Sequence, residues 1–381
     1  MILRIFAVLV FAFAAPISAQ TLDTSATAAL VVDYDTGAVL LEKNADTPIP
    51  PASMSKLMTL NMLFEAIEEG RVDMDDTFPV SANAHGYPGS TMFLETRHDP
   101  TVRDLIRGIV VLSGNDACIV VAEHLAGSEG AFASRMTERA RELGMDGSTF
   151  ANATGWPAES HRMSARDLVF LARRMMDEFG EYYPFFAERE FTWNGITQPN
   201  RNPLLYSSIA GDGLKTGHTE EAGYGLVGSA VRDGRRIIFM VTGLDSTETR
   251  TNESERIAAW AFREFENVTF FDGETPVAQA DVWLGEDKQV DLIAGEDIVA
   301  TLPRGQADEA TARVVYDGPV PAPIQAGQHI ADLLIETPGV GTMTIPLLAR
   351  SDVAEGGPMT RIVSSTGLLA SRAFDNLFGS D

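Results

Sequence analysis

Predicted strands lie at both ends of a long helical block, and this order constrains the fold more than any other feature of the chain. Apolar runs bounded by turn residues predict these strands at 28–34, 38–43, 213–219, 224–231 and 236–242. Asp35-Thr36-Gly37 and Asp233-Gly234 supply the turns of two hairpins. Between the two groups of strands, apolar residues recur at helical spacing. We therefore expect one α+β domain over residues 22–268, with a central antiparallel sheet and helices around it.

A smaller domain is expected after this one. Short alternating apolar runs recur between Gly, Pro and Asp turns over residues 274–355, which is the pattern of a small all-β domain. The stretch Gly356-Gly357-Pro358 follows as a linker. The final segment, 359–381, is amphipathic at helical period, so it is either a helix in a membrane interface or one packed on its own protein. Our working hypothesis is a C-terminal amphipathic helix that binds the membrane surface.

Composition narrows the possible partners. Of the 381 residues, 45% are hydrophobic, which suits a soluble globular protein with a sizeable core. The formal net charge of −25 repels phosphate, so no nucleic acid partner is expected. The six histidines lack the paired spacing of metal ligands, and we predict no metal and no other cofactor. Cys118 is the single cysteine, and its apolar helical surroundings predict a buried core residue.

The N-terminus has the features of a signal peptide. Arg4 gives it a positive charge, and residues 5–15 form an apolar stretch shorter than the roughly 20 residues that span a bilayer. The small residue Ala19 follows a helix-breaking Pro16, which predicts cleavage after position 19. We expect residues 1–19 to direct export to the periplasm. An uncleaved membrane anchor is the alternative.

Three short motifs carry the candidate chemistry, and their order along the chain makes the combination specific. The first, Ser53-Met54-Ser55-Lys56, is expected at the start of a helix, where residues three apart share a face. A serine hydroxyl is a poor nucleophile until a base takes its proton, and a neutral lysine amine can be that base. Burial and a nearby cation both favour the neutral amine, and Lys215 is the candidate cation.

The second motif, Ser113-Gly114-Asn115, lies between two predicted helices. The Ser113 hydroxyl can relay a proton, and the Asn115 amide can hold a lysine or a substrate carbonyl. Helix capping explains either residue when the motif is considered alone.

The third motif, Lys215-Thr216-Gly217, lies on a predicted strand. Because Gly217 has no side chain, an acyl group could approach the strand edge, and a peptide could pair with that edge as an added strand. The backbone N–H of His218 could form an oxyanion hole with that of Ser53. In combination, the three motifs indicate acyl transfer through a serine ester.

With the residues around these motifs, the chain resembles the low-molecular-mass penicillin-binding proteins, specifically the serine-type D-alanyl-D-alanine carboxypeptidases. The resemblance is carried by residues 51–59, 112–118 and 213–219, with Ala222-Gly223-Tyr224 and Arg201-Asn202 beside them. It implies a catalytic domain like that of β-lactamases and DD-peptidases, followed by the small all-β domain.

The resemblance implies a role for each catalytic candidate. Ser53 would be the acylated nucleophile and Lys56 its base, while Ser113 and Asn115 would line a second wall. One departure lies nearby, because Thr154 stands where relatives often carry a histidine. Substrate preference could differ for that reason.

The resemblance also implies how substrate is bound. Lys215, Thr216 and the His218 backbone would hold the terminal carboxylate and the acyl oxygen, with Gly217 between them. Arg250 is the best match to the arginine with which the family binds that carboxylate, although its spacing is one residue longer. A guanidinium fits a carboxylate in bidentate geometry. The alternative for Arg250 is a solvated loop arginine.

The implied function is removal of the terminal D-alanine from peptidoglycan pentapeptides through an acyl-Ser53 ester. The implied partners are peptidoglycan stem peptides, β-lactam antibiotics that trap Ser53, and the outer face of the cytoplasmic membrane. Three alternatives remain: an endopeptidase that cleaves cross-links, a class A β-lactamase, and a catalytically silent wall-binding protein. The β-lactamase would need a glutamate to activate water, and Glu159, the nearest candidate, lacks the expected flanking asparagine.

Overall fold

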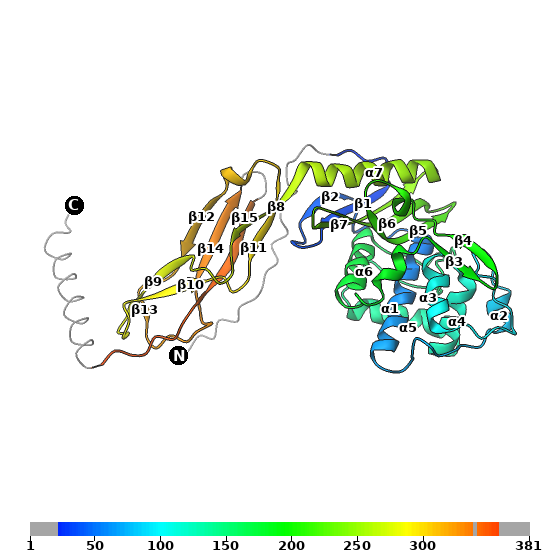
Figure 1. Cartoon of the computed structure of the whole chain (residues 1–381), viewed down its shortest axis with the longest axis horizontal. Helices are drawn as coiled ribbons and strands as arrows, with labels where there is room; N and C mark the ends of the chain where they lie inside the picture. The colour runs from blue at the N-terminus through cyan, green and yellow to red at the C-terminus, as the bar shows by residue number, and fades with distance from the viewer. Residues whose placement is uncertain (1–21, 338–340, 358–381) are drawn as a thin grey trace. The chain divides into compact units, whose positions relative to one another are not determined.

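The computed structural model describes residues 22–337 and 341–357 (Figure 1). These residues divide between Glu264 and Phe265 into two compact units, called here the N-terminal unit and the C-terminal unit. The predicted signal peptide, 1–19, and the predicted amphipathic helix, 359–381, lie outside the described residues.

The N-terminal unit is built on one five-stranded antiparallel sheet with the strand order β2-β1-β7-β6-β5. Its strands are β1 (Ala28–Asp33), β2 (Val39–Lys43), β5 (Gly211–Thr219), β6 (Gly223–Arg232) and β7 (Arg235–Leu244). The first strand pairs with the last, with Val31 opposite Phe239, so the two ends of this unit meet in the sheet. Strand β5, which carries the third motif, lies at the sheet edge.

Helices cover both faces of this sheet. Figure 1 shows α7 on one side and the main helical block on the other. The helices are η1 (Ala52–Ser55), α1 (Lys56–Glu68), α2 (Ala82–His85), α3 (Val102–Val110), α4 (Asn115–Ala126), α5 (Glu129–Glu142), α6 (Ala165–Asp177), η2 (Tyr183–Ala187), η3 (Pro203–Tyr206) and α7 (Thr247–Glu264). A short hairpin, β3 (Glu190–Trp193) and β4 (Ile196–Pro199), completes the unit.

Local sequence sets where the helices near the site begin. Thr101 and Asp104 form a capping box at the start of α3, and the Ser128 hydroxyl accepts a hydrogen bond from the third residue of α5. The chain turns between α3 and α4 through Ser113, whose φ of 58° is left-handed, and Gly114. This turn puts Asn115 at the first position of α4, whose following residues, Cys118 included, are buried as predicted.

Three element boundaries near the site and the junction of the units differ from the sequence expectation. Helix α7 begins at Thr247 rather than at Ser254. The prediction missed its first turns because they are polar and carry no amphipathic signal. Phe265, expected to end that helix, is the first residue of β8. Ser53 lies on the short 3-10 helix η1, directly before the α-helix that was expected to contain it.

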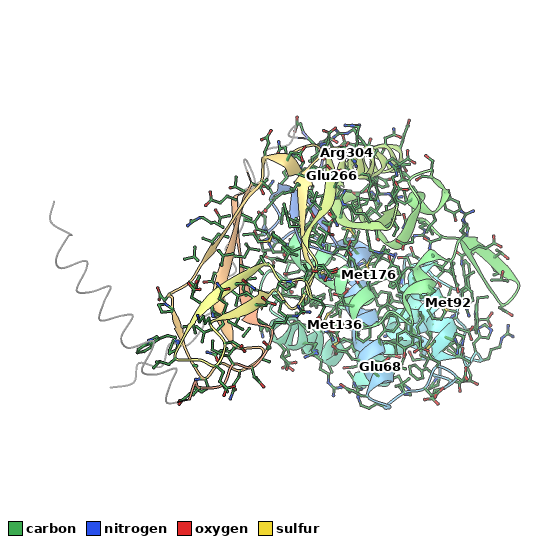
Figure 2. The ribbon with its side chains drawn as sticks, turned by 60° about the vertical axis from the view of Figure 1, so that its left-hand side comes forward. Glu68, Met92, Met136, Met176, Glu266 and Arg304 are labelled. Atoms are coloured by element: carbon green, nitrogen blue, oxygen red, sulfur yellow. The ribbon has the colours of Figure 1, made fainter. Side chains whose placement is uncertain are left out.

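The C-terminal unit consists of strands apart from one short turn of 3-10 helix, η4 (Ala307–Glu309), in the residues that are described. Its strands are β8 (Phe265–Phe271), β9 (Ala278–Trp283), β10 (Gln289–Ile293), β11 (Ile298–Pro303), β12 (Thr311–Val315), β13 (Val320–Pro321), β14 (His329–Thr337) and β15 (Gly341–Ala349). Six of them form a sheet in the order β12-β14-β15-β10-β9-β13, and β8 pairs with β11. Glu266 and Arg304, labelled in Figure 2, form an ion pair of 3.1 Å across that second pair of strands.

The expected α+β class with a following all-β domain is confirmed. Between residues 22 and 357, the described part contains no helix that is both long and apolar enough to cross a bilayer.

Candidate active site

Ser53 and Lys56 face each other at the junction of η1 and α1. A 3-10 helix has three residues per turn, so side chains three positions apart are eclipsed. The Lys56 Nζ lies 2.9 Å from the Ser53 Oγ. Lys56 is fully buried, whereas Ser53 is half-buried. The hydroxyl can therefore meet a substrate while the amine behind it stays out of bulk water.

Two further acceptors orient the lysine amine. The Lys56 Nζ donates to the Asn115 Oδ1 at 2.8 Å and to the main-chain carbonyl of Thr154. A neutral amine has two N–H donors and one lone pair. When the two acceptors take both hydrogens, the lone pair is left for the Ser53 hydroxyl. This geometry suits a general base.

Burial also favours the neutral amine. It lowers the pKa of Lys56 from its usual 10.5 to about 8, against the opposing effects of nearby Cys118 and Asp116, while Arg201 lowers it further. Burial likewise holds the pKa of Lys215 well below its usual range, and Lys56 and Arg201 add to that effect. The repulsion between Lys56 and Lys215 is mutual, so Lys215 stays the candidate cation beside Lys56, and Arg201 is a second cation that acts on both lysines.

The second wall is held by bonds around Asn115. Its Nδ2 donates to the Pro88 carbonyl at 2.7 Å, and its backbone N–H donates to the Ser90 carbonyl at 2.7 Å. Gly89, between these two, has a φ of +91°, and a Cβ there would lie 2.8 Å from the Asn115 Nδ2. Ser113 is nearly buried, at 3% exposed, and begins the turn that presents Asn115. A glycine at position 89 therefore lets the loop close on the amide.

Asp116, the next residue, anchors the same loop. Its carboxylate accepts hydrogen bonds from the Thr91 hydroxyl at 2.6 Å and from the backbone N–H groups of Met92 and Leu94 at 3.0 Å each. Met92, labelled in Figure 2, covers Gly108 of α3, where a Cβ would lie 2.4 Å from its sulfur. The loop that carries Ser90 is thus fixed from both sides.

The third motif packs directly against the nucleophile turn. A Cβ at Gly217 would lie 3.0 Å from the Pro51 carbonyl oxygen and 3.1 Å from the Met54 Cγ. The missing side chain therefore lets β5 pack closely against η1. We had expected a different reason for this glycine, namely room for an acyl group at the strand edge. Lys215 and Thr216 are buried, while His218 is exposed and its ring stacks on Tyr224.

Arg250 is buried in the first turns of α7, at 6% exposed, so it is not a solvated loop residue. Its Nη2 donates to the Arg201 carbonyl at 3.4 Å, and its guanidinium lies over the Tyr224 ring. Its Nε has no hydrogen-bond partner in the described residues. Burial lowers the pKa of both Arg201 and Arg250, and neither forms an ion pair with a carboxylate in that part of the chain. A buried guanidinium without a described carboxylate partner, as in Arg250, is suited to binding an anion.

Sequence reasoning missed three contributors to this site. Arg201 was noted only as part of the resemblance, although its Nη1 bonds the Ser90 hydroxyl at 2.7 Å and its charge reaches both lysines. Thr154 acts through a main-chain carbonyl, which residue type does not reveal. Asp116 could have been found, because it follows the second motif directly. In the described ranges, no cluster of His, Cys, Asp or Glu side chains could hold a metal ion.

Comparison with known proteins identifies the family. The family model described as D-alanyl-D-alanine carboxypeptidase matches residues 15–246. The chain belongs to this family. A second model, the C-terminal domain of penicillin-binding protein 5, matches residues 265–355 of the carboxypeptidase. The predicted family and the predicted class of serine-type hydrolase are therefore confirmed.

The similar proteins cover different shares of this chain. The D-alanyl-D-alanine carboxypeptidase DacC of Escherichia coli is 37% identical over 359 residues, which cover 92% of this chain and 90% of the relative. The crystal structure of penicillin-binding protein 5 from Haemophilus influenzae is 32% identical with a TM-score of 0.81, covering 88% of this chain and 100% of that one. Penicillin-binding protein D2 of Listeria monocytogenes in its ampicillin-bound form is 31% identical with a TM-score of 0.58, covering 64% of this chain and 99% of that one.

Proposed function

We propose that Ser53 is the acylated nucleophile of this carboxypeptidase and that Lys56 is its general base. The observation that carries the proposal is the 2.9 Å contact between the buried Lys56 Nζ and the Ser53 Oγ, with two other acceptors on the amine. The reaction is removal of the terminal D-alanine of a peptidoglycan stem peptide, in line with the family.

The proposed reaction has two steps. In the first, the Ser53 Oγ bonds to the carbonyl carbon of the penultimate residue while the neutral Lys56 takes the hydroxyl proton. The tetrahedral intermediate then collapses, the bond to the terminal D-alanine breaks, and the proton passes to the departing amine. In the second step, water attacks the carbonyl carbon of the Ser53 ester and gives its proton to the same base. The bond between the acyl carbon and the Ser53 Oγ then breaks, and the base returns the proton to that oxygen. Free Ser53 and a shortened peptide result.

Substrate is proposed to lie along β5. This strand is at the edge of its sheet, where an extended peptide can add as a further strand. The backbone N–H groups of Ser53 and His218 would bind the developing oxyanion, and losing one such donor typically costs about 10²–10³ in rate. Lys215 and Thr216 on this strand, with Arg250 and its unpartnered Nε, would hold the terminal carboxylate. Ser113 would relay protons between Lys56 and the leaving group.

β-Lactams are proposed to acylate the same hydroxyl. A β-lactam presents a reactive amide and a nearby carboxylate, which are the two features that Ser53 and Arg250 would recognise in a peptide. The ampicillin-bound form of the Listeria monocytogenes protein supports this proposal by similarity.

We further propose that residues 1–19 direct export to the periplasm and that residues 359–381 hold the enzyme on the outer face of the cytoplasmic membrane. The support is the sequence pattern of each segment. Flotation with phospholipid vesicles tests the second point, with the full mature chain expected to float and a chain ending at 357 expected to stay behind. Equal flotation of the two chains would contradict it.

The central experiment measures D-alanine release from a short peptide ending in D-Ala-D-Ala, with wild type and the Ser53→Ala variant. Wild type is expected to release D-alanine and to gain the mass of one penicillin, while the variant does neither. Release by Ser53→Ala at the wild-type rate would refute the proposal. Cleavage of cross-linked dimers without release from the monomer would instead identify the endopeptidase alternative.

A further inference from the structure

Glu129 lies outside the three motifs but contacts both segments that hold Lys56. It is the first residue of α5, after the capping Ser128, and is half-buried. One carboxylate oxygen, Oε1, accepts from the Ala153 backbone N–H at 3.1 Å and from the Tyr87 hydroxyl at 3.2 Å. These two donors come from separate loops, so a single atom joins them.

The first of these loops supplies the carbonyl that accepts from Lys56. Ala153 is fixed on both sides, since its N–H donates to Glu129 and its carbonyl accepts from the Thr59 hydroxyl at 2.7 Å. Thr154 follows, and its carbonyl shares a rigid peptide plane with the Gly155 N–H. That N–H donates to the Asn152 Oδ1 at 2.8 Å, which turns the opposite end of the plane, the Thr154 carbonyl, toward Lys56.

The second loop supplies the amide that accepts from Lys56. Tyr87 precedes Pro88, whose carbonyl accepts from the Asn115 Nδ2 at 2.7 Å. An amide has its donor and its acceptor at opposite ends. Because the Nδ2 is held by Pro88, the Oδ1 must face the other way, where it accepts from Lys56 at 2.8 Å. The position of Tyr87 therefore sets the second acceptor of the amine.

We propose that Glu129 is a positioning residue for Lys56. By holding Ala153 and Tyr87 at once, it keeps both acceptors of the lysine amine at the spacing that leaves the lone pair on Ser53. The inference rests on the proposed role of Lys56 as base. It assigns to Glu129 a hydrogen-bond acceptor and not a charge, since both of its bonds are accepted by one oxygen. A glutamine Oε1 could accept the same two bonds.

The test compares Glu129→Leu, which removes the acceptor, with Glu129→Gln, which keeps it. We expect Glu129→Leu to lower kcat for D-alanine release, and the rate of penicillin acylation, by roughly 10²-fold, the size of effect that follows small misplacements of catalytic groups. KM should stay within about twofold, because Glu129 does not touch the proposed binding residues. Glu129→Gln should restore most of the rate.

A matched control is Glu123→Leu on α4. The Glu123 carboxylate is also half-buried and also accepts one side-chain bond, from the Asn83 Nδ2 at 2.9 Å, but no described contact links it to Lys56. Its rates should equal those of wild type. If Glu129→Gln loses as much rate as Glu129→Leu, or if Glu129→Leu keeps the wild-type rate, the inference is wrong.

Tyr87→Phe gives a second route that does not depend on Glu129→Leu folding. Removing this hydroxyl should lower the acylation rate, by less than Glu129→Leu, because Ala153 stays held. In the double variant Glu129→Leu/Tyr87→Phe, the combined loss should be smaller than the sum of the two single losses, since both changes remove the bond between the Tyr87 hydroxyl and Glu129. The weaker contact of that hydroxyl with the Thr154 Oγ1, at 3.5 Å, is lost only with Tyr87→Phe. Additive losses would contradict the inference. Retained activity in Ser53→Ala would instead contradict the proposed function, so the two failures are distinguishable.

Discussion

The two units treat buried charge in opposite ways. The N-terminal unit buries Asp33, Lys56, Asp116, Asp167, Lys215, Arg250 and Glu253. In the C-terminal unit, the buried polar side chains of the described residues are two threonines, Thr301 and Thr337, and the core is aliphatic. Burying a charge costs stability unless partners compensate for it. The buried charges of the N-terminal unit are therefore explained by chemistry, whereas the aliphatic core of the C-terminal unit is explained by stability.

The signs of the buried charges sharpen this comparison. The buried carboxylates of the N-terminal unit have partners, such as Arg235 for Asp33 at 2.7 Å and Arg256 for Glu253 at 2.7 Å. The buried basic side chains Lys56, Lys215 and Arg250 form no ion pair with a carboxylate anywhere in the described ranges. The guanidinium of Arg250, which stays charged, is suited to an anionic ligand, which a peptide with a free terminal carboxylate would provide.

The largest expected effect is that of Lys56→Met. Removal of the proposed base should lower the acylation rate roughly 10⁴-fold, the upper range for general-base catalysis. The measurement is the rate of covalent labelling by a fluorescent penicillin. Lys288→Met, an exposed lysine of the C-terminal unit, is the control and should label at the wild-type rate. Labelling of Lys56→Met at more than about a tenth of that rate would exclude Lys56 as the base.

Leu292→Ala tests the other side of the comparison. Leu292 is fully buried in the aliphatic core of the C-terminal unit, so this change should cost about 3 kcal/mol of that unit's stability. Denaturant unfolding followed by Trp fluorescence measures the loss. D-Alanine release from a short peptide should not change in the folded protein. A matched Leu63→Ala change, in the core of the N-terminal unit, should reduce stability and active fraction together.

Arg250→Gln should raise KM for a D-Ala-D-Ala peptide about 10- to 100-fold, as expected for loss of a charge-assisted bond to a carboxylate. With the wild type, converting the terminal carboxylate of the peptide to an amide should raise KM by about the same factor. With Arg250→Gln, the same conversion should raise KM little further. Arg263→Gln, at the exposed far end of the same helix, is the control. If the increases in KM caused by the amide and by Arg250→Gln are independent and multiply, Arg250 does not bind that carboxylate.

The smallest expected effect concerns pH. A base acts only when neutral, and with its pKa at about 8 Lys56 is mostly protonated at pH 7 and mostly neutral at pH 9. The acylation rate should therefore rise about tenfold between these values and level off above them. Penicillin labelling at a series of pH values measures this. A rate that is flat or falls over this range would show that the neutral amine is not the active form.

The side chains inside the three motifs could be predicted from the sequence, whereas the Thr154 carbonyl and the role of Arg201, outside the motifs, could not. Ser53, Lys56 and Asn115 were predicted as site residues because the motifs are recognised by their side-chain types and spacing. The structure brings the three residues into contact. The Thr154 carbonyl has no such signature, since every residue has one. The helical position of Arg250 was missed because the first turns of α7 are polar, so periodicity gave no sign of a helix. The reason for the glycine at position 217 could not be predicted, because it lies in the packing of β5 against a segment distant in the sequence.

The free edge of β5 has a consequence for the behaviour of the enzyme in concentrated solution. A strand edge that is open to the proposed peptide substrate is equally open to the same strand of another molecule, and edge-to-edge association of this kind leads to aggregation. The net charge of −25 opposes such encounters, since like-charged molecules repel within a Debye length of about 8 Å at physiological ionic strength. High salt would remove that protection, so colloidal stability and the open edge of β5 are linked in this protein.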